Sequence, residues 1–252
     1  MGSNAALGKK GAKMTWSIVM HDAHTGAFAV AVATRAFAVG ASCPFVRSGV
    51  GAVSTQSITN RSLGPAVLDA IERGLSPEQA IAGALASDAG RGLRQVHAVD
   101  RLGRTAAWTG ENCVMWCGSM AAPGLSVAGN MLAGEEVVSD TLAAMAEPGP
   151  LPDRLLKAMR AGESAGGDRR GKQSAAMVMT TTEDFPDLDL RVDDHDDPLA
   201  ELERLAAIWQ RDVAPMLATR PSRADPAGLT DLDRIEAGWA ARGLDLRLRR
   251  PA

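Results

Sequence analysis

Residues 14–40 read MTWSIVMHDAHTGAFAVAVATRAFAVG, and this stretch decides the fold. Every second residue early in segment 15–22 is large and apolar, which is the period of a β-strand. The next four residues, AHTG, have the composition of a tight turn. Residues 27–34 are then apolar almost without interruption, as in a strand that is covered on both faces. The stretch therefore predicts a β-hairpin in the middle of the domain.

The composition limits the class of protein. A chain of 252 residues, 46% hydrophobic and 23% charged, is typical of one large globular domain or of one domain with an appendage. The net charge of -3 gives no reason to expect a nucleic-acid or anionic membrane partner, and no apolar run reaches membrane-spanning length. The three cysteines are an odd number, which indicates reduced thiols. We expect a cytoplasmic protein that binds neither membranes nor nucleic acids.

The remaining patterns follow the order strands, two helices, strands, two helices, strands, helix. This order is typical of an antiparallel α+β fold rather than of alternating βαβ units, and two sheets between helix layers would accommodate it. We expect a disordered lead over residues 1–14, one domain over residues 15–212, and a helical C-terminal extension over residues 213–252. The extension is rich in Arg, Asp and Pro.

Five motifs, taken together and in this order, resemble one bacterial family, the domain of unknown function 1028. The resemblance covers residues 15–211. It implies an N-terminal nucleophile (Ntn) hydrolase-like fold, a four-layer αββα sandwich, with no settled substrate. The motifs are TWSIV at 15–19, GAVSTQ at 51–56, GNMLAGEE at 129–136, GDRRGKQSAA at 167–176 and DLRVDDH at 189–195.

By this resemblance Thr15 is a candidate nucleophile. In Ntn hydrolases the first residue of the mature chain attacks an amide carbonyl, and its own α-amine serves as the base. A threonine hydroxyl needs an adjacent base, and an α-amine with a pKa of about 7.7–8.0 is partly neutral near pH 7. In this sequence the amine becomes free only after cleavage between Met14 and Thr15. The plain alternative is that Thr15 is a strand residue, since threonine favours strands.

The loop at residues 167–174 contributes further candidates. Asp168, Lys172 and Ser174 are expected to surround the amine of the nucleophile, where a nearby cation would lower its pKa. Arg170 is a candidate for substrate binding. Two alternatives remain open: a phosphate cradle, which lacks the usual glycine spacing, and a tight loop whose arginines pair with nearby carboxylates.

Three polar residues outside this loop are also candidates. Asn130 and Gln56 carry amide groups that could donate to a developing oxyanion or to substrate. Asn130 could equally be a helix cap or turn residue, because a glycine precedes it and a helix is expected after it. Arg35, at the end of the second strand, could bind a substrate carboxylate in bidentate fashion or be a surface charge.

The run of residues 193–197, DDHDD, suggests a metal site, but adjacent residues on a strand point to opposite faces. Asp197 before a proline also predicts the cap of the next helix. We therefore expect a strand-to-helix turn without a metal, and no cofactor. The pair Cys113 and Cys117 lacks the second pair that a zinc knuckle needs, so we interpret both as core thiols.

These observations predict an Ntn-type amidohydrolase that acts on a small amide or peptide-like compound through an acyl-enzyme on Thr15. The alternatives are a catalytically silent Ntn-fold protein that binds a metabolite or works by assembly, and a metal-assisted hydrolase. In the C-terminal extension, apolar residues recur every three to four positions and form one stripe. This stripe favours a homodimer over packing within the chain. It consists of Leu229, Leu232, Ile235 and Trp239.

Overall fold

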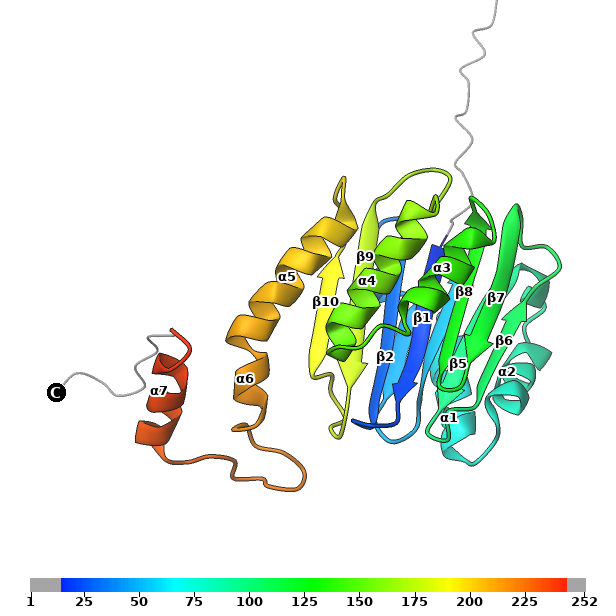
Figure 1. The fold of residues 1–252 in the computed structure, drawn as a ribbon. Coiled ribbons are helices and arrows are strands. Elements are labelled where there is room, and N and C mark those ends of the chain that lie inside the picture. The colour runs from blue at the N-terminus through cyan, green and yellow to red at the C-terminus, as the bar shows by residue number, and fades with distance from the viewer. Residues whose placement is uncertain (1–14, 244–252) are drawn as a thin grey trace, which may run out of the picture.

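The computed structural model describes residues 15–243 (Figure 1). The lead predicted for residues 1–14 lies outside the described residues, as do residues 244–252 at the end of the extension. Within the described part, the chain forms a mixed α+β structure with antiparallel sheets, as the order of patterns predicts.

Two sheets form the centre of the structure, and every pair of neighbouring strands in them is antiparallel. The six-stranded sheet has the spatial order β10 (Leu188–Val192), β9 (Ser174–Thr180), β2 (Ala27–Thr34), β1 (Thr15–Asp22), β8 (Leu125–Leu132) and β7 (Trp116–Ala122). The four-stranded sheet has the order β3 (Pro44–Arg47), β4 (Gly51–Ser57), β5 (Arg94–Asp100) and β6 (Thr105–Thr109). The predicted hairpin, β1 and β2, is confirmed and occupies the middle of the larger sheet.

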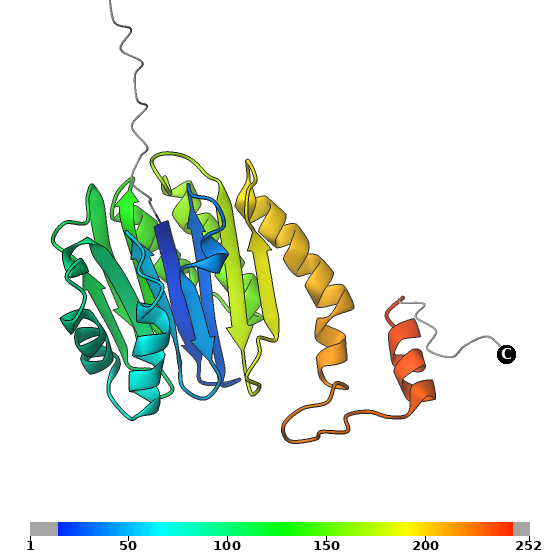
Figure 2. The ribbon, with the colours of Figure 1, turned by 180° about the vertical axis from the view of Figure 1, so that it is seen from behind.

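Helices cover the outer faces of both sheets (Figures 1 and 2). The larger sheet packs against α3 (Glu136–Ala144), α4 (Leu151–Ser164) and α5 (Pro198–Asp212). The smaller sheet packs against α1 (Leu63–Glu72) and α2 (Pro77–Ala86). The connections include the short helices η1 (Val39–Ala41), η2 (Arg91–Leu93) and α6 (Ala214–Leu217), and α7 (Leu232–Ala240) follows them.

The alternation in β1 sorts its side chains between two environments. Trp16, Ile18 and Met20 belong to the apolar cluster under the helices of the larger sheet. Val19 belongs instead to a small cluster that fills the space between the two sheets. Neighbouring residues of a strand point to opposite faces, so Thr15 and Ser17 also face the four-stranded sheet.

Two details differ from the sequence-based expectation. Pro44 and Gly49 predict a connection after the hairpin, but residues 44–47 form the edge strand β3 and pair with β4. The sequence pattern predicts a strand over residues 125–129, but β8 continues to Leu132, so Asn130 lies inside it rather than in a turn before α3. The helix cap predicted at Asp197 is confirmed, because its carboxylate accepts the backbone N–H of Ala200 at 3.0 Å.

Helix α7 stands apart from the two sheets (Figures 1 and 2) and buries none of its residues. Its residue Leu232 is exposed, and Ile235 and Trp239 are half-buried. Within residues 15–243, the helices are all too short or too polar to span a bilayer.

Candidate functional site

Four polar side chains lie in one row across neighbouring strands, at the end of the larger sheet where β1 begins. Thr15 pairs with Asn130 of β8 on one side and with Thr34 of β2 on the other. Thr34 in turn pairs with Ser174 of β9. Each of the four is at most 3% exposed. Residues that pair across strands point to the same face, so the row faces the four-stranded sheet.

Thr15 borders a cavity at this end of the sheet. Its hydroxyl donates a hydrogen bond to Thr34 Oγ1 at 3.1 Å. The cavity, which we call the Thr15 cavity, has a volume of about 140 Å³. Its walls come from the segment after β2, which contributes Phe37 and Cys43, and from the segment after β4, which contributes Thr59 and Arg61. The hydroxyl that the sequence predicts as a nucleophile therefore lies beside a space that a small molecule can enter.

The side-chain amide of Asn130 donates a hydrogen bond through its nitrogen, but its oxygen accepts none from the described chain. Its Nδ2 donates to Gln95 Oε1 at 2.9 Å. The Gln95 amide is fixed in this orientation because its Nε2 donates to the carbonyl oxygen of Gly129 at 2.8 Å. Asn130 Oδ1 is consequently a buried acceptor, and it has no hydrogen-bond partner within the described chain. An acceptor directly opposite Thr15 in the sheet is suited to bind an amine.

Asp168 fixes the end of β2 and the loop that precedes β9. Its carboxylate accepts the backbone N–H of Arg35 at 2.7 Å and pairs with Arg170 Nη2 at 3.0 Å. The guanidinium of Arg35 donates to Gln173 Oε1 at 2.7 Å. The acid and the two arginines predicted for the site therefore form one cluster beside the row, where Asp168 is 8% exposed.

Lys172 lies on the helix side of the larger sheet. Its ammonium is 2.9 Å from Glu163 Oε1 and 3.6 Å from Asp197 Oδ2. Together with Trp16 and Asp168, it lines a second cavity of about 170 Å³. Thr34 borders both cavities, so the two spaces meet at the same strand end on opposite sides of the sheet.

Ser174 supports the wall of the Thr15 cavity. Its hydroxyl donates to the carbonyl oxygen of Ala36 at 2.5 Å and accepts the backbone N–H of Val39 at 3.1 Å. The backbone N–H of Ala38, between these two, donates to the carbonyl oxygen of Asp193 at 2.9 Å. The segment that carries Phe37 is thus held at several points of its backbone.

Gln56 lies in a buried polar network between the sheets. Its Nε2 donates to Gln95 Oε1 at 2.9 Å and to the carbonyl oxygen of Ala128 at 3.1 Å. Its Oε1 accepts the hydroxyl of Ser17 at 2.8 Å. Both N–H groups of Gln56 are therefore used inside the core.

The same network contains His97, which is not among the residues predicted from the sequence. His97 is fully buried, with Nε2 2.7 Å from Ser17 Oγ and Nδ1 3.0 Å from Ser126 Oγ. Burial lowers the pKa of the imidazole to about 3, so the ring is neutral at physiological pH. A signal was present: Gln95 and His97 lie two residues apart in β5, as Ser54 and Gln56 do in β4, so each pair points to one face of its strand.

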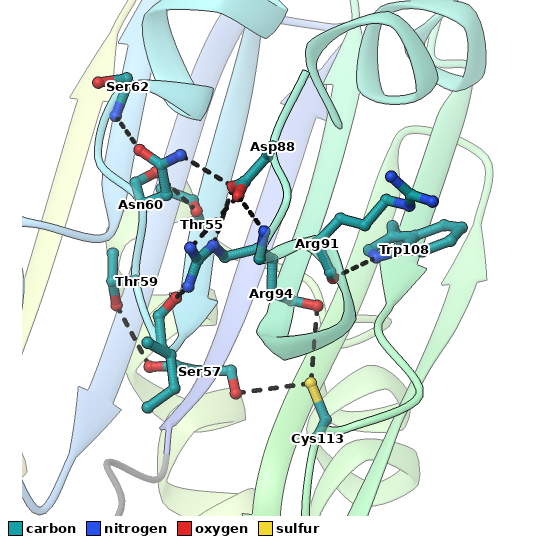
Figure 3. Close-up of polar contacts among 12 residues, drawn as sticks. Thr55, Ser57, Thr59, Asn60, Ser62, Asp88, Arg91, Arg94, Trp108 and Cys113 are labelled. Atoms are coloured by element: carbon teal, nitrogen blue, oxygen red, sulfur yellow. Dashed lines mark hydrogen bonds and ion pairs between the residues drawn. The ribbon is translucent and has the colours of Figure 1, made fainter. Parts of the chain in front are cut away.

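A cluster of hydrogen bonds holds the segment after β4 (Figure 3). Arg94 Nε pairs with Asp88 Oδ2 at 2.9 Å, and Arg94 Nη1 donates to the carbonyl oxygen of Ile58 at 2.7 Å. Asn60 Nδ2 donates to the same carboxylate at 2.9 Å. The hydrogen bond from Arg94 is the main reason why the pKa of Asp88 is lowered to about 2. This cluster fixes the backbone on both sides of Thr59, which lines the cavity.

Replacing Asp88 by asparagine tests how firmly this segment is held. The folded-state pKa of Asp88 is below its unfolded value, so its ionisation stabilises the protein above pH 4, and that contribution is lost as the pH falls toward 2. We expect Asp88→Asn to lower the free energy of unfolding at pH 7 by about 2 kcal/mol. Urea titrations at pH 7 and pH 3 measure the effect, which shrinks by about half at pH 3. An equal loss at both pH values would contradict this account.

The run at residues 193–197 forms the turn between β10 and α5. Arg191 Nη2 pairs with Asp193 Oδ1 at 2.9 Å, and Asp194 Oδ1 accepts Gln173 Nε2 at 3.0 Å. His195 Nδ1 accepts the backbone N–H of Asp197 at 3.0 Å. Within residues 15–243, no group of three or more His, Cys, Asp or Glu side chains is placed to hold a metal ion.

Comparison with known proteins identifies the family. No curated protein sequence matches the chain. Residues 15–202 match the profile described as "Family of unknown function (DUF1028)". The crystal structure of protein SPO2555 from Silicibacter pomeroyi is similar, with 32% identity and a TM-score of 0.79 over 85% of this chain and 95% of that chain.

A second solved structure is far less similar. Anbu (ancestral beta-subunit) from Yersinia bercovieri has 10% identity over 82% of this chain and 98% of that chain. Its TM-score of 0.34 is too low to carry an argument about a shared fold. The match over residues 15–202 confirms the resemblance seen in the sequence motifs. This chain belongs to the DUF1028 family of unknown function.

Proposed function

We propose that this protein is an Ntn-type amidohydrolase that acts on a small amide or peptide-like compound, with Thr15 as the nucleophile. One observation carries the proposal: Thr15 is the first residue of the central strand β1, and its hydroxyl side borders a cavity. A strand that is paired on both sides holds its side chains rigidly, as a reacting group requires. We also propose the four-layer αββα arrangement of Ntn hydrolases for residues 15–212, because helices pack on the outer faces of both sheets.

The chemistry begins with cleavage between Met14 and Thr15, which frees the α-amine. The neutral amine takes the proton of the Thr15 hydroxyl while Oγ1 bonds to the carbonyl carbon of the amide. The carbon–nitrogen bond then breaks, the leaving amine takes that proton, and an ester joins the acyl group to Thr15. Water hydrolyses this ester, which releases the acid and restores the hydroxyl. The net reaction consumes one water for each amide bond.

The neighbours of Thr15 suit this sequence of steps. Asn130 Oδ1, which lacks a donor among the described residues, would accept a hydrogen bond from the freed amine. Asn130 Nδ2 keeps a second N–H beyond the one given to Gln95, and we assign that N–H to the oxyanion. Ser174 is a positioning residue, since it holds the cavity wall. Asp168, with Arg170 and Arg35, positions the loop that closes the row.

The mass of the natively produced protein tests the proposal at its first step. We expect a mature chain that begins at Thr15, and this form, but not the full chain, should release amines from members of a library of small amides. A full-length native chain, together with a form beginning at Thr15 that hydrolyses none of them, would refute the enzyme and favour a silent binding protein.

We further propose a homodimer, formed through α7, in a cytoplasmic setting. In α7, Leu232 is exposed and Ile235 and Trp239 are only half-buried within the described chain, and a second copy would cover them. The three cysteines are free thiols, which suits a reducing compartment. Light scattering on the full chain and on a chain that ends at Arg211 tests this: the full chain should be a dimer and the shortened one a monomer. A folded shortened chain that stays dimeric would exclude α7 from the interface.

A further inference from the structure

The Thr15 cavity has one charged group in its lining. That group is Arg61, an exposed residue in the segment between β4 and α1. No hydrogen bond or ion pair joins its guanidinium to any residue of the described chain. The other lining residues are neutral, and no carboxylate is among them. A guanidinium at the wall of a cavity without an acidic partner is a binding group for an anion.

The backbone that carries Arg61 is fixed before any ligand arrives. Asn60, its neighbour, binds the Asp88 carboxylate through Nδ2 and accepts the backbone N–H of Ser62 through Oδ1 at 3.1 Å (Figure 3). The carbonyl oxygen of Asn60 also accepts the hydroxyl of Thr55 at 3.2 Å. Less ordering entropy is therefore lost when a ligand binds, and affinity for a small anion gains accordingly.

The apolar part of the cavity wall limits the size and character of the ligand. It presents Phe37, Val39 and Cys43, from the segment that Ser174 holds. An engineered cavity of about 150 Å³ holds one benzene molecule, so a cavity of about 140 Å³ takes a group of similar size. A short ligand can therefore lie against an apolar wall with one end at Thr15 and an anionic end at Arg61.

We propose that the Thr15 cavity selects small amides that carry a carboxylate, and that Arg61 pairs with this carboxylate. The assignment rests on the proposed function, because it concerns the substrate of the same site. Arg61 is a binding residue in this scheme and takes no part in the proton transfers. A carboxylate on a short chain is compatible in size with a cavity of about 140 Å³.

Binding to an inert form of the full chain tests the inference without relying on catalysis. In a Thr15→Ala background, N-acetylglycine and its neutral analogue N-acetylglycinamide are titrated and followed by NMR. We expect N-acetylglycine to bind at least tenfold more tightly, and Arg61→Gln to abolish that preference. Arg61→Lys should restore part of it, because the charge returns without the bidentate geometry. Raising the salt concentration should weaken the preference.

Arg101→Gln is the matched control. Arg101 is an exposed arginine in the turn between β5 and β6, where it lines a different cavity. Its replacement should leave the preference for N-acetylglycine unchanged. Equal binding of the two probes, or a preference that survives Arg61→Gln, would overturn the inference.

Kinetics on the form that begins at Thr15 separate this inference from the proposed function. Hydrolysis with a kcat/KM preference for carboxylate-bearing amides that Arg61→Gln removes would support both. Hydrolysis without such a preference would refute the role of Arg61 and leave the amidohydrolase standing. Tighter binding of carboxylate-bearing amides without any hydrolysis would refute the proposed amidohydrolase activity and would still support the anion site at Arg61.

Discussion

Thr15→Ala, made in the form of the protein that begins at Thr15, should lower the rate of amide hydrolysis by at least about a thousandfold, because removing a nucleophile leaves only binding and electrostatic catalysis. Thr15→Ser should retain part of the activity, since both the hydroxyl and the α-amine remain. Release of primary amine from the best substrate of the amide library measures both effects.

The fold should survive these changes. Thr15→Ala removes one buried hydrogen bond, to Thr34, so we expect a loss of about 1 kcal/mol in the free energy of unfolding. Thr25→Ala, in the exposed turn between β1 and β2, is the matched control and should keep full activity. An alanine variant at position 15 that hydrolyses amides at the normal rate would exclude Thr15 as the nucleophile.

His97→Gln should make the protein less sensitive to acid. The folded-state pKa of His97 is about 3, below the value of 6.5 for an unperturbed histidine, so the unfolded state binds an additional proton between these two pH values. Stability is therefore lost as the pH falls below 6.5. From pH 7 to pH 5 this one group lowers the free energy of unfolding by about 2 kcal/mol.

Glutamine is neutral and can still bind hydroxyl groups, so in the variant that part of the pH dependence should disappear. Urea denaturation at pH 7, 6 and 5 gives the free energy of unfolding of the variant and of the parent at each pH. The slope of this free energy against pH should be smaller for the variant, whatever stability the variant loses at pH 7. His24→Gln, in the exposed turn of the hairpin, is the matched control for the substitution itself. Identical slopes for His97→Gln and the parent would show that the buried imidazole does not titrate in this way.

Local sequence patterns predicted the central hairpin and the family. The features that these patterns missed depend on which strands pair with one another in the sheets. Strand β3 is a short edge strand with half-buried residues, and β4 alone pairs with it in the sheet. Its four residues have too little alternation to distinguish a strand from a connection. Asn130 follows a glycine, which is typical of a turn, yet it stays in β8 because Thr15 and Cys117 pair with it from both sides.

In the candidate site, too, some residues were predictable from local sequence and others depend on contacts between distant parts of the chain. Thr15, Asn130 and Ser174 carried local signals through their motifs, and the sheet register places them in one row. Arg61 carried no such signal, because a single arginine in a loop resembles any surface charge. Its place in the lining of the same cavity as Thr15 depends on how the two sheets pack, and no short stretch of sequence encodes that packing.

The row at the end of the larger sheet fixes the number of residues in β1. Each residue added to the strand or removed from it reverses the face to which Thr15 points. Thr15 is held in register by two neighbours at once, Asn130 and Thr34. Deleting one residue between Thr15 and the hairpin turn would reverse the two faces: Thr15 would point under the helices and Trp16 into the space between the sheets. Deleting two would restore the face but move Thr15 out of the row by two residue pairs, to the place opposite Val32. Evolution can therefore exchange side chains along β1, but it cannot shorten or lengthen the strand without losing the site.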